Sequence, residues 1–243
     1  MKEKDIYKDI MGRAMLDFAQ GAPWENIRTW TSVAGEDELP LPYLFRNFEQ
    51  MPAIEQRALK LCKGSILDIG CGSGIHSLWL QKNNFDVKAI DISKGAIEVC
   101  RLNGVKQAEV NDIWELRNER FDTLLLLMNG MGMCGTLSRI EGLLQHLKSL
   151  LKPGGQILAD SSDIVYMFEG GEEEDDDELD LPEDHYYGEV LFQTFYKELK
   201  GEVFPWLYVD YPNLELHASK AGLNCELVLP GDHYDYLARL TIA

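Results

Sequence analysis

Short apolar runs alternate with stretches of helical spacing along the middle of this 243-residue chain. The runs that predict strands span residues 65–69, 86–90, 108–110, 121–128 and 156–159. Between them, apolar residues recur every three or four positions and predict helices at 75–83, 93–103 and 138–151. Strands and helices that alternate in this way favour right-handed crossovers and a parallel sheet. The run at 121–128 is apolar over most of its length, which is typical of a strand covered on both faces.

Two segments lie outside this alternation. Residues 1–60 are rich in aromatic side chains and predict a helical cap, broken at Pro40-Leu41-Pro42, over the carboxyl end of the first strand. Residues 61–243 predict one α/β domain with an insertion at 161–210.

The insertion begins with an acidic run at 172–178, for which a solvated loop is the favoured interpretation. Two β-rich stretches follow, at 190–196 and 203–209, and Lys200-Gly201 is the predicted hairpin turn between them. A helix and a strand pair then complete the chain, at 213–221, 225–229 and 236–242.

Charge and cysteine content narrow the classes of partner. The formal net charge is -18 and the sequence pI is about 4.6, which argues against phosphate backbones and anionic membrane surfaces as partners. The five cysteines are scattered without a CxxC pair, as expected of reduced thiols in a cytoplasmic protein, and no histidine or cysteine spacing predicts a metal site. The longest apolar run is too short to span a bilayer, and the first ten residues lack a signal-peptide core.

The strongest local signal is the run Asp68-Ile69-Gly70-Cys71-Gly72-Ser73-Gly74 between a predicted strand and a predicted helix. Glycine allows a sharp turn and lets a ligand approach the backbone closely, while the helix amino terminus presents unpaired N–H groups. A dinucleotide fingerprint would place its last glycine one residue later, where this chain has Ile75. The tighter GxGxG loop suits a ligand without a pyrophosphate.

A second anchor is Asp91, which ends the second predicted strand. Its carboxylate would lie at the sheet edge where open α/β sheets bind ligands, and it can accept hydrogen bonds from both hydroxyls of a ribose. An acid at this position would serve a nicotinamide cofactor equally well.

These motifs, in this order, resemble the class I S-adenosylmethionine-dependent methyltransferases. The resemblance extends from Ile66 to Asp160 and implies a Rossmann-like three-layer sandwich, with a mostly parallel seven-stranded sheet and a final antiparallel strand. It implies S-adenosyl-L-methionine as the cofactor. Residues that would hold its methionine part are Asp68, through the amino group, the loop residues Gly70, Cys71, Gly72 and Gly74, and Asn129 after the fourth strand.

By the same resemblance, Asp91 would bind the ribose and Ile92 would pack on the adenine. The segment Asn111-Asp112-Ile113 resembles the one in which an acid takes the adenine amino group, and Asp112 is preferred over Asn111. Ile113 joins the predicted adenine site. The turn at 150–155 is similar to the one before the family's fifth strand.

The resulting hypothesis is an enzyme that methylates a small-molecule acceptor, with a protein acceptor as the second choice. Two other classes stay open: a cofactor-binding regulatory or scaffold module without turnover, and an NAD-dependent oxidoreductase. The sequence assigns no catalytic base, acceptor or oligomeric state. His76 could reach the cofactor or the acceptor, but the favoured interpretation is a partly exposed helix residue. His233 and Tyr234 could line the acceptor pocket, but a polar loop is favoured. Asp160 and Asp163 could equally be bases or turn residues.

Overall fold

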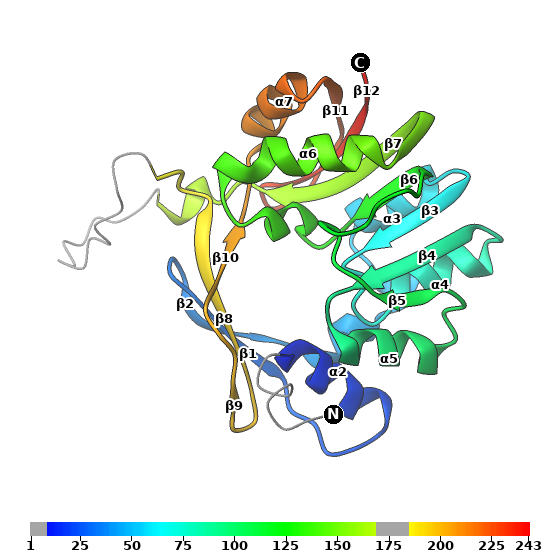
Figure 1. Ribbon diagram of the computed structural model, residues 1–243. Coiled ribbons are helices and arrows are strands. Elements are labelled where there is room, and N and C mark those ends of the chain that lie inside the picture. Colours follow the sequence, from blue (N-terminus) through cyan, green and yellow to red (C-terminus); the bar gives the residue numbers. More distant parts are fainter. Residues whose placement is uncertain (1–8, 169–184) are drawn as a thin grey trace.

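The computed structural model describes residues 9–168 and 185–243, so the acidic run at 172–178 lies outside the described residues. Its main sheet has seven strands in the order β11-β12-β7-β6-β3-β4-β5 (Figure 1). Only β12 runs antiparallel to its neighbours, so the predicted mostly parallel sheet with an antiparallel final strand is confirmed. The strands are β3 (Ser65–Ile69), β4 (Asp86–Asp91), β5 (Ala108–Val110), β6 (Phe121–Leu126), β7 (Leu151–Ser162), β11 (Leu223–Pro230) and β12 (Asp235–Ile242).

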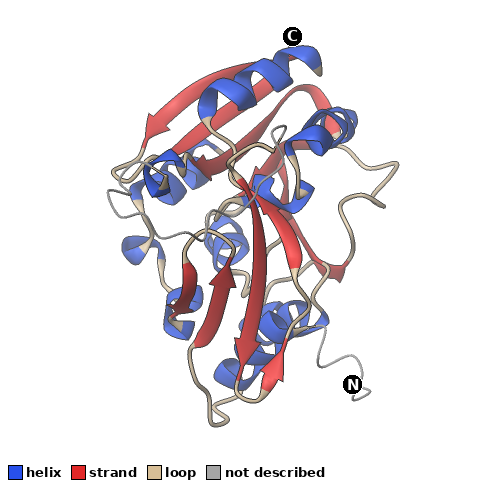
Figure 2. Cartoon of the chain, turned by 90° about the vertical axis from the view of Figure 1, so that its left-hand side faces the viewer, coloured by secondary structure: helices blue, strands red, loops and turns tan. Residues whose placement is uncertain are grey.

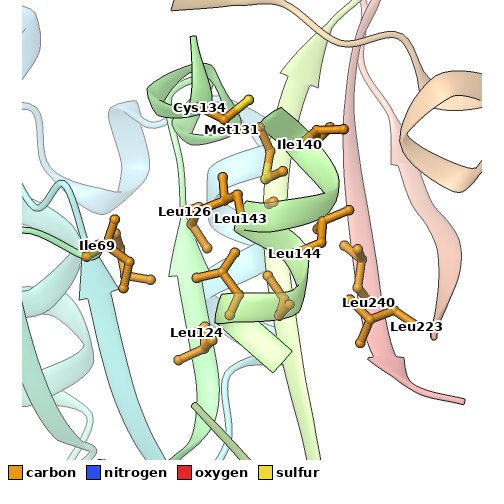
Figure 3. Close-up of a cluster of buried hydrophobic side chains, with 14 of the residues drawn as sticks. Ile69, Leu124, Leu126, Met131, Cys134, Ile140, Leu143, Leu144, Leu223 and Leu240 are labelled. Atoms are coloured by element: carbon orange, nitrogen blue, oxygen red, sulfur yellow. The ribbon is translucent and has the colours of Figure 1, made fainter. Parts of the chain in front are cut away.

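Helices cover both faces of this sheet and make three layers. One face packs against α3 (Ala53–Leu61), α4 (Ile75–Lys82) and α5 (Lys94–Asn103), and the other against α6 (Ile140–Ser149) and α7 (Tyr211–Lys220). Strand β6 shows why its second half is apolar: Leu124 and Leu126 contact the α6 side, whereas Leu125 contacts the α3 side. Figure 3 shows the α6 side, where Leu143 and Leu144 point onto the strands.

A second, smaller sheet has the order β10-β8-β1-β2, with β9 paired to β8, and all its pairs are antiparallel. Figure 2 shows these strands side by side in its lower half. Two come from the amino-terminal segment and three from the predicted insertion. Their bounds are β1 (Ile27–Thr31), β2 (Gly35–Leu39), β8 (Glu189–Tyr196), β9 (Leu199–Lys200) and β10 (Phe204–Leu207).

This sheet corrects the expectation of a helical segment at 1–60. Its described part does contain α2 (Ile10–Ala19) and α3, as well as two 3₁₀ turns, η1 (Leu41–Phe45) and η2 (Phe48–Gln50). Residues 27–39, however, form a hairpin. Strand β1 is rich in Thr, Trp and Ile, which favour extended backbone, and it is stabilised by pairing with β8.

The predicted hairpin in the insertion is present, but its turn was placed wrongly. Strand β8 reverses at Lys197-Glu198, because Tyr196 pairs with Leu199, and Lys197 adopts the left-handed conformation (φ 52°). Gly201 instead donates its N–H to the Thr194 carbonyl (2.8 Å), where the second strand is irregular.

The amino-terminal helix α2 is fastened to the amino end of α5. Asp9 accepts a hydrogen bond from its own helix at Gly12 N (3.1 Å) and another from Gly95 N (2.9 Å). A Cβ on either glycine would overlap the facing helix, so the two backbones pack directly on each other. The amino-terminal segment is thereby held close to the carboxyl end of β4.

Candidate functional site

A cavity of about 950 Å³ lies at the carboxyl ends of β3, β4 and β6. Its remaining walls come from α2 and from the second sheet. This is the edge at which open α/β sheets bind ligands. Nine of the ten predicted cofactor-binding residues line it: Asp68, Gly70, Cys71, Gly72, Asp91, Ile92, Asp112, Ile113 and Asn129.

The glycine loop curls over the end of β4. Gly70 and Cys71 both donate their N–H groups to the Ile90 carbonyl, at 2.9 and 3.1 Å. Gly70 (φ 70°) and Gly72 (φ 53°) are left-handed, a conformation that glycine adopts without a Cβ clash. Gly72 lines the cavity, and nothing lies within 4 Å of the position a Cβ would take there.

Gly74 has a different reason to be glycine. It is not among the described residues that line the cavity, although it too is left-handed (φ 82°) and forms the N-cap of α4. A Cβ there would lie 2.8 Å from Cys100 Sγ and 2.9 Å from Val105 Cγ2. Gly74 thus permits close packing of α4 on α5.

Cys71 also packs against this helix. It is buried, and its Sγ lies 3.6 Å from Cys100 Sγ. The interaction with Cys100, together with burial, raises the pKa of Cys71, which leaves this thiol protonated and unsuited to act as a nucleophile.

A hydrogen bond joins the two predicted anchors, the glycine loop and Asp91. Its Oδ2 accepts a hydrogen bond from Gly72 N (3.0 Å), and its Oδ1 accepts one from Ser93 N (2.8 Å). Burial raises the pKa of Asp91, while these two N–H donors act in the opposite direction. Each carboxylate oxygen retains a lone pair for a ligand in the cavity.

Asp68 lies deeper, at the end of β3. It is buried, and its Oδ2 accepts a hydrogen bond from Ser77 Oγ (2.6 Å), a residue of α4. Burial raises the pKa of Asp68, whereas the nearby His76 and the Ser77 hydroxyl lower it. This acid is therefore held in one orientation facing the cavity.

The two predicted adenine contacts follow neighbouring strands. Ile92 is 74% exposed just past β4, and buried Ile113 follows the end of β5. Asp112 is exposed, and its Oδ1 accepts from Trp114 N (2.9 Å), which turns the chain there. Trp114 is a cavity-lining residue that the sequence analysis missed, although its position after Ile113 was a usable signal.

Asn129 and the preceding Met128 are both left-handed, at φ 57° and 62°, and both line the cavity. Asp160 at the end of β7 holds them: its Oδ2 accepts from Met128 N (3.1 Å) and its Oδ1 from Asn129 N (2.9 Å). Ser162 Oγ donates to the Asn129 side-chain oxygen (3.2 Å). Burial and the Glu55 carboxylate raise the pKa of Asp160 to about 7, against the effect of the two N–H donors and His76.

The interpretation of His76 as a partly exposed residue is wrong. It is only 5% exposed, lines the cavity, and bonds through Nε2 to Glu55 Oε2 (2.7 Å). Glu55 in turn binds the Arg46 guanidinium, and both of these residues are buried. Burial would raise the pKa of Glu55, but His76 and Arg46 together hold it below its usual value.

The wall opposite the glycine loop is aromatic. It is formed by side chains of β8 and β10 and of the residue just after β10, namely Phe192, Phe204, Trp206 and Tyr208. Trp206 lies against Gly132 in the 3₁₀ turn η3 (Gly130–Cys134), where a Cβ would overlap the indole ring. His233 and Tyr234 are not among the described residues lining the cavity, and Tyr234 stacks on Tyr166 instead (5.0 Å).

Residues 9–168 and 185–243 contain no group of three His, Cys, Asp or Glu side chains arranged to hold a metal ion. None of their helices is long and apolar enough to cross a membrane.

Comparisons with known proteins agree with this geometry. A family model described as "Methyltransferase domain" matches residues 43–186. A crystal structure of an S-adenosylmethionine-dependent methyltransferase from Bacteroides fragilis, in complex with S-adenosyl-L-homocysteine, is 43% identical, with a TM-score of 0.87 over 98% of this chain and 96% of that one. The structure of Streptomyces venezuelae DesVI, 16% identical with a TM-score of 0.55 over 79% of this chain and 91% of that one, shares the fold.

Curated relatives match a shorter part of the chain. The ubiquinone biosynthesis O-methyltransferase of Histophilus somni is 31% identical over 117 residues, covering 45% of this chain and 49% of the relative. The protein of the same name from Pectobacterium atrosepticum is 28% identical over 147 residues, or 58% of this chain and 60% of the relative. The chain thus spans about half to three fifths of these relatives' length.

Proposed function

This chain belongs to the S-adenosylmethionine-dependent methyltransferases, and on that premise we propose that it transfers a methyl group from S-adenosyl-L-methionine to a small-molecule acceptor in the cytoplasm. The observation that carries the proposal is a single cavity with two unlike ends. One end has the glycine loop bonded to Asp91, and the other has the aromatic wall of the second sheet.

The first end fits the cofactor. The open space at Gly72 accommodates a ligand chain against the backbone, and Asp91 beside it has free acceptor capacity for the ribose hydroxyls. Asp68 would hold the amino group of the methionine part, and Ile92 and Ile113 would contact the adenine. Asp112 would bind the adenine amino group from the exposed side, and Asn129 would face the methionine part.

The second end fits a compact, largely apolar acceptor. Four aromatic side chains, from residues 192, 204, 206 and 208, line the cavity. Four methionines from α2 and from the segment after β6 line it too: Met11, Met15, Met128 and Met133. Pockets for small molecules are concave and mainly apolar, with a few polar groups that fix orientation. The curated relatives bear a name from small-molecule chemistry, ubiquinone biosynthesis.

The chemistry divides between the cofactor and the chain. S-adenosylmethionine supplies, when bound, a methyl group made electrophilic by its positively charged sulfur. The chain supplies orientation: the left-handed loop at Met128 and Asn129 and the aromatic wall confine the acceptor beside the cofactor site. All five cysteines are free thiols, which supports the cytoplasmic assignment.

The first test is a set of calorimetric titrations with S-adenosylmethionine, S-adenosylhomocysteine and NADH. Saturable binding of the first two without a response to NADH is expected. Binding of NADH alone would replace the proposal with an oxidoreductase.

The second test measures S-adenosylhomocysteine formed with a cell extract that has been divided by ultrafiltration. Product with the low-molecular-weight filtrate is expected. Product with the retained macromolecules alone would indicate a protein acceptor, and tight cofactor binding without product in either fraction would indicate a non-catalytic module.

A further inference from the structure

Resting on the proposed function, we propose that Asp160 is a positioning residue: as a carboxylate, it holds the backbone of Met128 and Asn129 in the conformation that binds the cofactor. Asp160 is not among the described residues that line the cavity, whereas both loop residues are. It therefore acts through the loop and not by contact with a ligand.

The loop needs such a support because of its backbone. Two consecutive residues with side chains are left-handed, a conformation that is unfavourable for any residue with a Cβ and that persists only where the surroundings impose it. The Asp160 carboxylate imposes it by accepting one N–H on each oxygen, Met128 N on Oδ2 and Asn129 N on Oδ1.

Strand register puts Asp160 in the right place. Strands β6 and β7 are parallel neighbours with Leu126 opposite Ala159, so Asp160 lies beside the first residue after β6. Ser162, two residues further along β7, binds the Asn129 side chain. The end of β7 therefore determines the shape of the loop after β6.

The ionised form of Asp160 accepts both hydrogen bonds at full strength, one on each oxygen. Protonation leaves one carbonyl oxygen and a hydroxyl oxygen that is a weaker acceptor, and in an asparagine the NH₂ group would present hydrogen to an N–H group. The carboxylate also adds negative charge close to the part of the cavity assigned to the cationic cofactor.

Charged and titratable groups surround Asp160 from several elements. Glu55 of α3 raises its pKa and His76 of α4 lowers it, and Tyr43 of η1 is close enough to interact with it electrostatically. Its partner on β12 is the apolar Leu237. With burial, these groups bring the pKa of Asp160 to about 7, so the form that supports the loop is lost as the pH falls through neutrality.

Linkage then predicts proton release on cofactor binding. If the ionised form binds S-adenosylmethionine more tightly, binding lowers the pKa of Asp160 and releases up to about half a proton at pH 7. Affinity should weaken, by up to about tenfold, from pH 8 to pH 6. The amino group of the cofactor titrates in the same range, so the difference between wild type and a variant is the measure.

The experiment is calorimetry of S-adenosylmethionine binding between pH 6 and 8, in two buffers of different ionisation enthalpy. Three proteins are compared: wild type, Asp160→Asn, and Asp163→Asn as a matched control. Asp163 directly follows β7 and accepts hydrogen bonds from Tyr187 Oη and Val165 N, and none of these three residues is among the described residues that line the cavity. We expect Asp160→Asn to bind about tenfold more weakly at pH 8, equivalent to about 1.4 kcal/mol, with a reduced pH slope and reduced proton release. Asp163→Asn should match wild type.

A measurement without substitution covers the case in which Asp160→Asn does not fold. In ¹⁵N–¹H NMR spectra of the wild-type protein, the amides of Met128 and Asn129 should shift together with a midpoint near pH 7, because both are bonded to the titrating group. Unmoved amides, or an Asp160→Asn variant equal to wild type in affinity, pH slope and proton release, would overturn the inference. A wild-type protein that binds no S-adenosylmethionine at any pH would instead overturn the proposed function.

Discussion

Gly72 and Gly74 occupy equivalent places in the GxGxG pattern, yet the structure predicts opposite consequences for replacing them by alanine. Both are left-handed, at φ 53° and φ 82°. Gly72 lines the cavity and a Cβ there would meet open space, whereas a Cβ at Gly74 would meet Cys100 and Val105. The pair therefore separates a glycine that we propose is required by the cofactor from a glycine required by packing.

For Gly74→Ala the cost falls on stability. Placing a Cβ on a left-handed residue costs about 1–2 kcal/mol. The new methyl group would lie 2.8 Å from Cys100 Sγ and 2.9 Å from Val105 Cγ2, and overpacking of this kind costs about 1–3 kcal/mol. We expect the free energy of unfolding to fall by about 2–5 kcal/mol, a large share of a domain's usual stability of about 5–15 kcal/mol.

For Gly72→Ala the cost falls on binding. Only the backbone penalty applies to the unliganded protein, so the free energy of unfolding should fall by about 1–2 kcal/mol. The methyl group would lie on the loop proposed to bind the cofactor, at a residue that lines the cavity, and affinity for S-adenosylmethionine should fall at least about tenfold, or about 1.4 kcal/mol.

The assay is urea unfolding of both variants without ligand, together with calorimetric titration of the folded proteins with S-adenosylmethionine. The reasoning is refuted if Gly74→Ala is as stable as Gly72→Ala, or if Gly74→Ala remains fully stable but loses cofactor affinity. Either result would contradict the packing role of Gly74, and the second would indicate that Gly74 binds the cofactor.

Three further substitutions test other parts of the site. Asp91→Ala removes the proposed ribose ligand and should weaken S-adenosylmethionine binding by about 2–3 kcal/mol in calorimetry; unchanged affinity would exclude the ribose role. Gly132→Ala places a Cβ inside the Trp206 ring and should lower the free energy of unfolding by about 1–3 kcal/mol, measured by urea unfolding, while cofactor affinity stays near wild type. Glu55→Gln removes the charge between two buried partners and should cost about 3–5 kcal/mol of stability at pH 7. Because the pKa of Glu55 is lowered on folding, that deficit should be constant above about pH 5 and shrink as the pH falls. A deficit independent of pH down to acid unfolding would contradict the charge argument.

The grouping of the predicted cofactor residues around one cavity could be foreseen because their signals are local in sequence. Asp68, Asp91 and Asn129 each lie at or just past the end of a strand, and the carboxyl ends of parallel strands meet at one edge of a sheet. The glycine pattern needed no knowledge of distant residues. What the pattern could not reveal was the separate role of Gly74, since that depends on Cys100, 26 residues away.

The buried ionic contacts could not be predicted from the sequence, because they join residues that only the folded chain brings together. Glu55 precedes the motif by more than ten residues, and nothing in its local pattern shows that it will be buried between Arg46 and His76. Asp160 was recognised as an acid at the correct edge, but its hydrogen bonds to Met128 and Asn129 depend on the register of two strands.

The part of the cavity proposed for the acceptor is built from segments outside the family match, unlike the part proposed for the cofactor. Residues 43–186 match the methyltransferase domain and contain the predicted cofactor residues. The aromatic wall lies beyond that range, at 192–208, whereas α2 and β1 lie before it. These two ends of the chain meet because β1 pairs with β8, with Arg28 opposite Phe195. Pairing over such a separation is set by packing of the whole fold and not by any local pattern. The cofactor can therefore be inferred from motifs, whereas the acceptor must be read from side chains that no motif relates to one another.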